Sequence, residues 1–435
     1  MRLRCEACGF VAEGPLRPIV CPRCGGLMRP EGGGRWSGPG EGAGIWRFEG
    51  ALPSLRVKIS LGEGSTPLIS SARLAGGLDL KFKDEGRNPT GSFRDRAAAL
   101  MVSDAASAGA RRVILASDGD TAASVAAYSA RAGIPVTAYV PAGSDVEKVL
   151  MARAYGATVI VREEGIDELA DKVGERARRE GLYDATSTHN ELGLEGMATI
   201  AYELALQAPL ARRVYVPLGS GLTYLALSIG YELMERSGAI PRAPEIVGVE
   251  TCGNPLYSSR VSGAKKCAEE APPTMRYLRP PILEHVLRAM ERRGTAMAVR
   301  MRDVVQAAKR LAREEGLFVE PASAVALAGF LEEPEDRSVV LLTGQGLKAS
   351  SAYARPARSR YLEAFPSATK HMIVELLRRE PGLTGYEIWK RLGLRISPQA
   401  IYQHLSDLAR RGVVRAELVG GSKRYYVASG AERPT

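Results

Sequence analysis

The sequence predicts an α/β protein whose parallel sheets are covered by helices on both faces. Apolar runs typical of buried strands alternate with helical stretches through the middle of the chain. Two Cys-x-x-Cys pairs lie close together near the N-terminus, and a basic segment follows at the C-terminal end. The length of 435 residues allows about two to four domains, so both ends can carry separate modules.

The first segment has the pattern of a structural metal site. Cys5 and Cys8 form one Cys-x-x-Cys pair, and Cys21 and Cys24 form the second. Four thiolates at this spacing suit a tetrahedral Zn²⁺ ion and leave no open position for catalysis. We therefore expect a zinc ribbon over residues 1–30, followed by a glycine-rich linker over residues 31–44.

Short apolar runs rich in β-branched residues mark the strands of the central region. The expected strands are 112–116, 136–140, 158–161, 213–216, 245–249 and 339–342. One helix is expected to begin at Phe93, and another is expected over residues 122–132. Ligands of doubly wound sheets bind outside the carboxyl ends of the strands, so the loops that follow these runs are the expected site.

The stretch over residues 83–96 decides the functional interpretation. Its letters, KDEGRNPTGSFRDR, closely resemble the lysine motif of threonine synthases and their fold-type II relatives, which use pyridoxal phosphate. The resemblance implies a tryptophan-synthase-beta-like fold, with two doubly wound parallel-sheet subdomains over residues 45–355. In that family the residue after Ser-Phe is a lysine that holds the cofactor as a Schiff base, and here it is Arg94. A guanidinium stays protonated, so no covalent pyridoxal phosphate is expected.

Three loops resemble the ligand loops of the family, and each departs from them. Residues 117–121 correspond to the family's Ser-Ser-Gly-Asn-Thr, which holds the substrate carboxylate and the cofactor's phenolic oxygen. Asp118 and Asp120 stand at the two altered positions and would repel both groups. Residues 219–223 resemble the phosphate cradle, with Leu222 replacing a glycine, and residues 343–348 resemble Thr-Gly-His-Gly-Leu-Lys, with Gln345 replacing the histidine.

These changes suggest a pocket rebuilt around charged side chains. Arg94 should project into the space of the imine, and a direct ion pair with Asp118 or Asp120 is expected. The alternative is a purely structural ion pair in a pocket without function. No residue is expected to be catalytic. The expected ligand-binding residues are Lys83, Ser92, Arg94, Asp118, Asp120, Thr121, Gly219, Ser220, Gly221 and Thr343.

The C-terminal segment carries most of the excess positive charge. Residues 366–435 hold 12 Lys/Arg and 6 Asp/Glu, whereas the other 365 residues hold 47 and 43. After a linker over residues 356–365, residues 366–430 resemble a winged-helix DNA-binding domain of the PadR or ArsR kind. Its expected helices are 371–377, 386–392 and 398–411, and its hairpin strands are 413–418 and 425–427, joined through Gly420-Gly421.

The third helix of this segment is the expected DNA-reading element. Ser397 is its expected N-cap, and the apolar stripe of Ile401, Leu405 and Leu408 should be buried. The alternative is a winged helix used only for protein contact. The expected DNA contacts are Gln399, Tyr402, Gln403, Lys423 and Arg424.

Other features limit where the protein acts. No apolar run approaches the ~18 residues of a membrane span, and the N-terminus lacks a secretory signal, so a cytoplasmic protein without membrane contact is expected. A homodimer is expected, as is common for both kinds of domain. Cys252 and Cys267 belong to no motif and are expected to be unpaired thiols.

Three functions are compatible with the sequence. The first is a catalytically inactive threonine-synthase-like protein that senses a small metabolite in the former cofactor pocket and regulates transcription through DNA. The second is an active threonine synthase that makes threonine from O-phosphohomoserine and carries an accessory winged helix. The third is an interaction module that binds neither ligand nor DNA. The residue at position 94 separates the first from the second.

Overall fold

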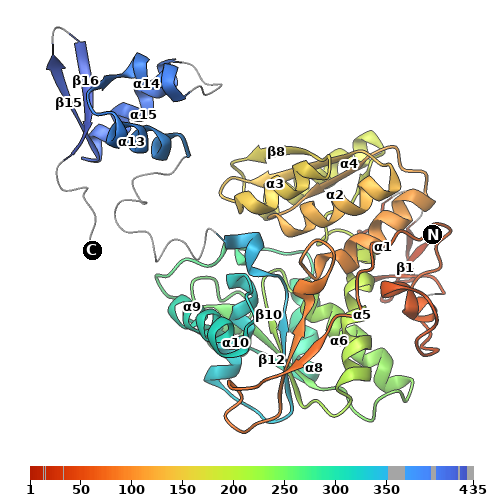
Figure 1. Ribbon diagram of the computed structural model, residues 1–435. Helices are drawn as coiled ribbons and strands as arrows, with labels where there is room; N and C mark the ends of the chain where they lie inside the picture. The colour runs from red at the N-terminus through yellow and green to blue at the C-terminus, as the bar shows by residue number, and fades with distance from the viewer. Residues whose placement is uncertain are drawn as a thin grey trace. The chain divides into compact units, whose positions relative to one another are not determined.

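The computed structural model describes residues 1–12, 14, 16–32, 34–350, 368–392, 398–419 and 422–428. The chain divides into two compact units, Met1–Ser350 and Ser351–Thr435, which are described separately (Figure 1). Every helix within the described ranges is too short or too polar to span a bilayer.

The N-terminal segment forms a small antiparallel sheet of order β2-β1-β3. Its strands are β1 (Leu3–Cys5), β2 (Val11–Ala12) and β3 (Met28–Pro30). Leu3 and Met28 are buried in one small cluster with Cys5 and Cys21. Trp36, which lies within the expected linker, packs against Phe48 of η1 (Gly44–Ala51) and against Tyr202, so this stretch contributes to the core.

The smaller subdomain is a parallel sheet of order β8-β7-β6-β9. Val113 and Leu115 of β6 pack into the same core as the helices that precede and follow this strand, whereas Ile114 and Ala116 pack with α4. Alternate side chains are therefore buried on opposite faces, which explains why the strand is apolar throughout. The elements are α1 (Arg94–Ser107), β6 (Val113–Ala116), α2 (Asp120–Ala132), β7 (Val136–Pro141), α3 (Val146–Ala154), β8 (Thr158–Arg162), α4 (Ile166–Glu180) and β9 (Tyr183–Asp184).

The larger subdomain contains a six-stranded sheet of order β12-β11-β10-β13-β5-β4, in which only the edge pair β4–β5 is antiparallel. Figure 1 shows α9 and α10 on one side of this sheet and α5 and α6 on the other. The strands are β4 (Leu68–Ser70), β5 (Leu80–Asp84), β10 (Arg213–Pro217), β11 (Glu245–Thr251), β12 (Gly294–Val299) and β13 (Ser338–Leu342). The helices are η2 (Glu85–Arg87), α5 (Glu191–Gln207), α6 (Leu222–Arg236), α7 (Ser258–Val261), η3 (Pro273–Met275), α8 (Leu283–Arg293), α9 (Met301–Arg310), η4 (Leu311–Glu315), α10 (Pro321–Glu332) and η5 (Gly346–Ala349).

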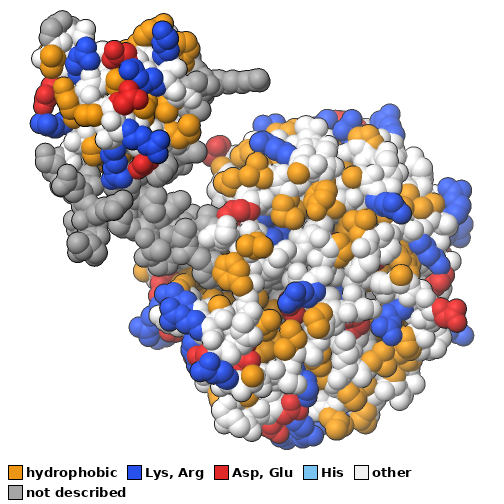
Figure 2. Space-filling model, viewed as in Figure 1, with side chains coloured by type: hydrophobic (Ala, Val, Ile, Leu, Met, Phe, Trp, Pro, Cys, Tyr) orange, Lys and Arg blue, Asp and Glu red, His pale blue; other side chains and the backbone are white. Residues whose placement is uncertain are grey.

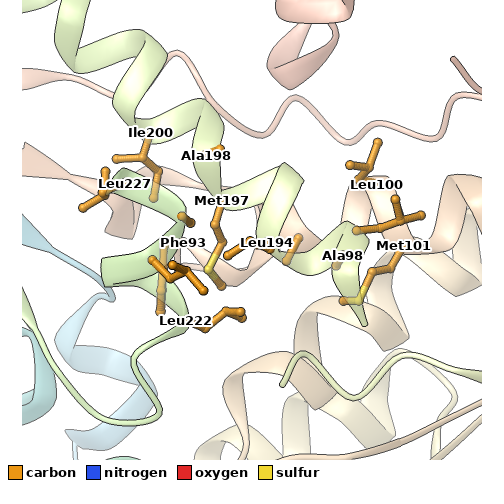
Figure 3. Packing of buried hydrophobic residues seen from close by; sticks show 14 of the residues in the cluster. Phe93, Ala98, Leu100, Met101, Leu194, Met197, Ala198, Ile200, Leu222 and Leu227 are labelled. Atoms are coloured by element: carbon orange, nitrogen blue, oxygen red, sulfur yellow. The ribbon is translucent and has the colours of Figure 1, made fainter. Parts of the chain in front are cut away.

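Helix α5 links the two subdomains through close backbone contacts. A Cβ on Gly196 would lie 2.4 Å from the carbonyl oxygen of Arg96 in α1, so only glycine permits this approach. The side chain of Met197 lies beside Phe93 and Leu222 in the core (Figure 3). The starts of α1 and α6 are therefore both held against α5.

Each of the six strands expected in the central region is present, and the parallel α/β architecture is confirmed. The expectation that Cys252 and Cys267 are unpaired is wrong, because they form a disulfide with a Cα–Cα distance of 5.3 Å. Cys252 follows β11, and the backbone N–H of Cys267 donates to the Cys252 carbonyl at 2.8 Å. The loop conformation, which sequence spacing does not reveal, brings the two thiols together.

Among its described residues, the C-terminal unit has three helices and an antiparallel sheet of order β14-β16-β15. Ile401, Leu405 and Leu408 are fully buried, as expected from their spacing. The expected cap at Ser397 and the turn at Gly420-Gly421 lie outside the described residues. The elements are α13 (Ala368–Arg379), β14 (Leu383–Thr384), α14 (Gly385–Leu392), α15 (Pro398–Arg410), β15 (Val414–Val419) and β16 (Ser422–Val427).

Candidate functional site

The candidate site lies where α1 begins. Arg94 is the first residue of α1, and the preceding residue is anchored by a hydrogen bond from the Phe93 N–H to the Thr343 carbonyl at 2.9 Å. Only 9% of Arg94 is exposed. Its guanidinium lies over the Phe93 ring at 4.6 Å from the centroid and donates one hydrogen bond to Ser187 Oγ at 3.2 Å.

The loop after β6 carries two buried carboxylates that do not pair with Arg94. Asp118 accepts a hydrogen bond from the Tyr277 hydroxyl at 3.3 Å, and Asp120 begins α2. Among the described residues Arg94 forms no ion pair, so the expected direct Arg94–carboxylate bridge is wrong. Two lysines from other elements bind Asp120 instead, and Asp118 accepts its hydrogen bond from Tyr277.

These two lysines form a buried charge cluster that the sequence did not reveal. Lys148 of α3 lies 2.8 Å from Asp120 and 2.8 Å from Glu320, and Lys348 of η5 lies 2.8 Å from the other Asp120 oxygen. Burial opposes a charge on Lys148, but Asp120 and Glu320 overcome that effect and raise its pKa well above its usual range. Burial likewise opposes the charge on Asp120, yet Lys148 and Lys348 lower its pKa.

Glycine at position 119 makes this cluster possible. Its φ is +136°, and an added Cβ would lie 2.7 Å from Lys148 Cδ. The lysine side chain therefore crosses directly over the loop. Because the cluster joins α2 and α3 of the smaller subdomain to Glu320 and Lys348 of the larger one, it also ties the two subdomains together at the site.

Lys83 belongs to a different buried network, away from the cavity. Its Nζ lies 2.6 Å from Glu203 and donates to the Thr66 carbonyl at 2.8 Å. Arg96 bridges Glu203 and Glu85 with nitrogen–oxygen distances between 2.7 and 2.9 Å. Lys83 is therefore placed as a structural residue, not as one that faces a ligand.

Arg96→Met tests how much this network contributes to the stability of the fold. The change leaves Glu85 and Glu203, both at most 2% exposed, without their main counter-ion. We expect the free energy of unfolding to fall by about 3–5 kcal/mol, the usual cost of breaking a buried ion pair. Urea unfolding of the full chain measures this change in the free energy of unfolding. Arg87→Met is the control, because Arg87 is 65% exposed in its pair with Asp84. A similar loss in both variants would contradict the prediction.

The loop before α6 forms the opposite wall of the cavity. Gly221 has a φ of +88°, and a Cβ there would lie 2.5 Å from the Tyr257 hydroxyl oxygen. That hydroxyl donates to the Ser220 carbonyl at 2.6 Å and holds the loop against the larger subdomain. Leu222, the first residue of α6, is 1% exposed and packs in the hydrophobic core (Figure 3). Leu222 and Thr223, in the first turn of α6, both line the cavity.

Seven of the ten residues expected to bind a ligand line this cavity. These are Arg94, Asp118, Asp120, Gly219, Ser220, Gly221 and Thr343. Lys83, Ser92 and Thr121 do not line it, and Ser92 Oγ instead accepts a hydrogen bond from Lys348 at 3.1 Å. Thr274 and Met275 also line it, but they lie in η3, a short segment that carries no recognisable motif.

The residues present do not fit a covalently held pyridoxal phosphate. Arg94 cannot form an imine, and the two nearby amines, Lys148 and Lys348, are both held by carboxylates. The cavity measures about 50 Å³, room for roughly three to five waters. Pockets for drug-sized ligands are commonly about 300–1,000 Å³.

The cysteine-bearing turns of the N-terminal segment form a second candidate site. The Sγ atoms of Cys5, Cys8, Cys21 and Cys24 all lie within 4.8 Å of one another. Cys5 and Cys21 are buried, whereas Cys8 and Cys24 are exposed. This clustering brings together the four residues expected to bind metal, and all four ligand atoms are sulfur.

The exposed face of α15 is the candidate nucleic-acid interface. Gln399, Tyr402 and Gln403 are exposed, and Tyr402 packs against Gly385 at the start of α14, where an added Cβ would lie 2.3 Å from its ring. Lys423 is also exposed. Arg424 is half-buried and donates to the Gly382 carbonyl at 2.6 Å, so it also braces the domain itself.

The comparisons with known proteins agree with the architecture. A family profile described as "Pyridoxal-phosphate dependent enzyme" matches residues 59–344. The threonine synthase of Methanocaldococcus jannaschii is 35% identical over 77% of this chain and 88% of its own length, and that of Methanosarcina acetivorans is 35% identical over 66% and 73%. The solved structure of an O-ureido-L-serine-bound mutant of O-ureido-L-serine synthase shares the fold, with a TM-score of 0.56, 20% identity and coverage of 71% and 95%. The chain belongs to the family of pyridoxal-phosphate dependent enzymes, with threonine synthases among its relatives.

Proposed function

We propose that the protein is a catalytically inactive member of this family that senses a small metabolite and regulates transcription through its C-terminal unit. Arg94 is the observation that carries the proposal, because it removes the imine-forming amine at the start of α1. The ion pairs of Lys148 and Lys348 with Asp120 support it, since they occupy both neighbouring amines with a carboxylate.

The C-terminal unit supports the DNA-binding half of the proposal. Helices α14 and α15 follow one another, and a two-stranded hairpin of β15 and β16 comes after them, which is the order of a winged helix. The buried stripe of α15 leaves Gln399 and Gln403 exposed on the same helix. Figure 2 shows Lys and Arg side chains distributed over the visible face of this unit. We further propose that the protein acts as a homodimer on two related half-sites.

Duplex DNA binding by the full chain is the test. We expect binding to selected genomic fragments that weakens steeply with salt, because basic side chains displace counterions from phosphates. Lys423→Ala should weaken binding to all sequences alike and reduce the salt slope by about one. Gln403→Ala should instead relax sequence preference at one position, by roughly 1–3 kcal/mol. Electrophoretic mobility shifts over a salt series measure both effects.

Arg313→Ala is the matched control for this test. Arg313 is an exposed cation of the first unit, so removing it changes the net charge as much as Lys423→Ala does. It should leave DNA affinity unchanged. If the full chain shows no salt-sensitive binding at low ionic strength, the regulator proposal fails and a protein-interaction module takes its place. Equal losses in both variants would show that net charge, not the hairpin, governs binding.

An active threonine synthase is the second candidate. The observation that favours it is the 35% identity to proteins named as threonine synthases. An imine of pyridoxal phosphate absorbs visible light, so the absorbance of the full chain mixed with the cofactor separates the two candidates. A visible band that survives gel filtration would favour the enzyme.

A further inference from the structure

Two buried opposite charges line the same cavity and do not meet. Arg94 is 9% exposed and Asp118 is 6% exposed, and both line the cavity at the start of α1. The hydrogen bonds of these two side chains go to neutral groups, from Arg94 to Ser187 and from Tyr277 to Asp118. A buried charge without an opposite charge in contact is costly, so this arrangement favours a ligand that supplies charge to both.

Arg94 offers unused hydrogen-bond donors to the cavity. A guanidinium has five N–H groups, and one hydrogen bond is formed among the described residues, to Ser187. The first turn of α6, with Ser220 and Gly221 before it, faces the same cavity. A helix of this length carries a partial positive charge at its N-terminus. This wall therefore suits an anionic group.

Asp118 is the carboxylate of the cavity that remains available to a cation. Asp120 and Glu320 also line the cavity, but Lys148 binds both of them, and Lys348 binds Asp120 as well. Burial raises the pKa of Asp118, and Arg94 only partly offsets that effect. A cationic donor beside Asp118 would stabilise its ionised form.

We propose that this cavity binds a small zwitterion, a free α-amino acid about the size of glycine, alanine or serine, without a covalent bond. Its carboxylate would lie against Arg94 and the first turn of α6, and its ammonium against Asp118. The cavity volume of about 50 Å³ favours a ligand of a few heavy atoms. This inference deepens the proposed function, on which it rests, by naming the chemical class of the sensed metabolite.

Calorimetric titration of the full chain with L-alanine tests the proposal. Propionate lacks the ammonium and ethylamine lacks the carboxylate, yet both keep nearly the same shape. We expect L-alanine to bind at least about tenfold more tightly than either analogue, because each lost charge-assisted hydrogen bond weakens binding by about that factor. Glycine and L-serine are tested in the same way, each against its own matched analogues. Equal binding of propionate or of inorganic phosphate would overturn the proposal in favour of a simple anion site. No binding of any of the three amino acids at millimolar concentration would also overturn it.

Two variants locate the binding at the named residues. Arg94→Met and Asp118→Asn should each weaken amino-acid binding about tenfold or more, with folding checked by thermal melting. Arg87→Met removes an exposed arginine of the same motif, outside the cavity, and should not change binding. Unchanged affinity in a folded Arg94→Met or Asp118→Asn protein would overturn the assignment. If either variant fails to fold, the affinities of L-alanine, propionate and ethylamine for the unaltered protein decide whether the cavity binds a zwitterion.

The titrations contain no DNA, so this inference and the regulator proposal can fail separately. Amino-acid binding without any DNA binding would overturn the regulator proposal alone. DNA binding without amino-acid binding would overturn the ligand assignment alone.

Discussion

Arg94→Lys is expected to place an amine at the start of α1 without producing threonine synthase activity. The new ammonium would face Asp118 in a buried cavity, which favours its protonated, non-nucleophilic form. Asp120 is already bound by Lys148 and Lys348, so that side of the site stays closed to a cofactor ring. Release of phosphate from O-phosphohomoserine should stay at the uncatalysed rate in this variant and in the unaltered protein. Active enzymes exceed that rate by roughly 10⁶-fold or more.

Borohydride reduction in the presence of pyridoxal phosphate provides the chemical counterpart of this assay. No pyridoxyl adduct is expected on Lys83, Lys148 or Lys348, because each of these side chains is buried and bound to a carboxylate. Peptide mapping against exposed lysines such as Lys172 gives the background labelling. An adduct on Lys148 would show that this lysine of α3 binds the cofactor in place of the lysine missing at position 94. Threonine synthesis by Arg94→Lys alone would show that the altered loops do not block the cofactor.

One Zn²⁺ per chain is expected at Cys5, Cys8, Cys21 and Cys24. We propose a structural zinc there, because four thiolates close together form a complete tetrahedral ligand set. The N-terminal sheet buries little besides Leu3, Met28 and the two inner cysteines. Zinc binding is worth about 10–16 kcal/mol in small zinc modules, so its removal should unfold this segment. Elemental analysis measures the zinc content, and hydrogen exchange with and without chelator measures the unfolding of the segment.

Cys24→Ser should abolish stoichiometric zinc, because three thiolates leave the site open and weak. Cys252→Ser is the matched control, since its sulfur belongs to the disulfide and not to this cluster. It should retain one zinc per chain. Protein purified without chelator that contains no zinc would contradict the assignment.

The local pattern of apolar residues was sufficient to predict much of the fold. Strands such as β6 and β13 are buried on both faces, and a continuous apolar run is the direct consequence of that burial. The stripe of Ile401, Leu405 and Leu408 follows from helical periodicity in the same way. Strands β9 and β12 are not among the expected ones. β9 has only two residues, and β12 begins at a glycine and buries only half of its six residues, so both carry a weaker pattern.

The sequence by itself determined the architecture, the clustering of the four N-terminal cysteines and the loss of the amine at position 94. Each of these depends on residue type and near spacing. Only the tertiary structure decided which buried charges meet. Asp120 binds Lys148 and Lys348, not Arg94, and Cys252 joins Cys267, because packing brings these groups within reach. Coulomb energy falls with distance and rises in a low-dielectric interior, so pairs are set by the folded geometry and cannot be deduced from the order of residues along the chain.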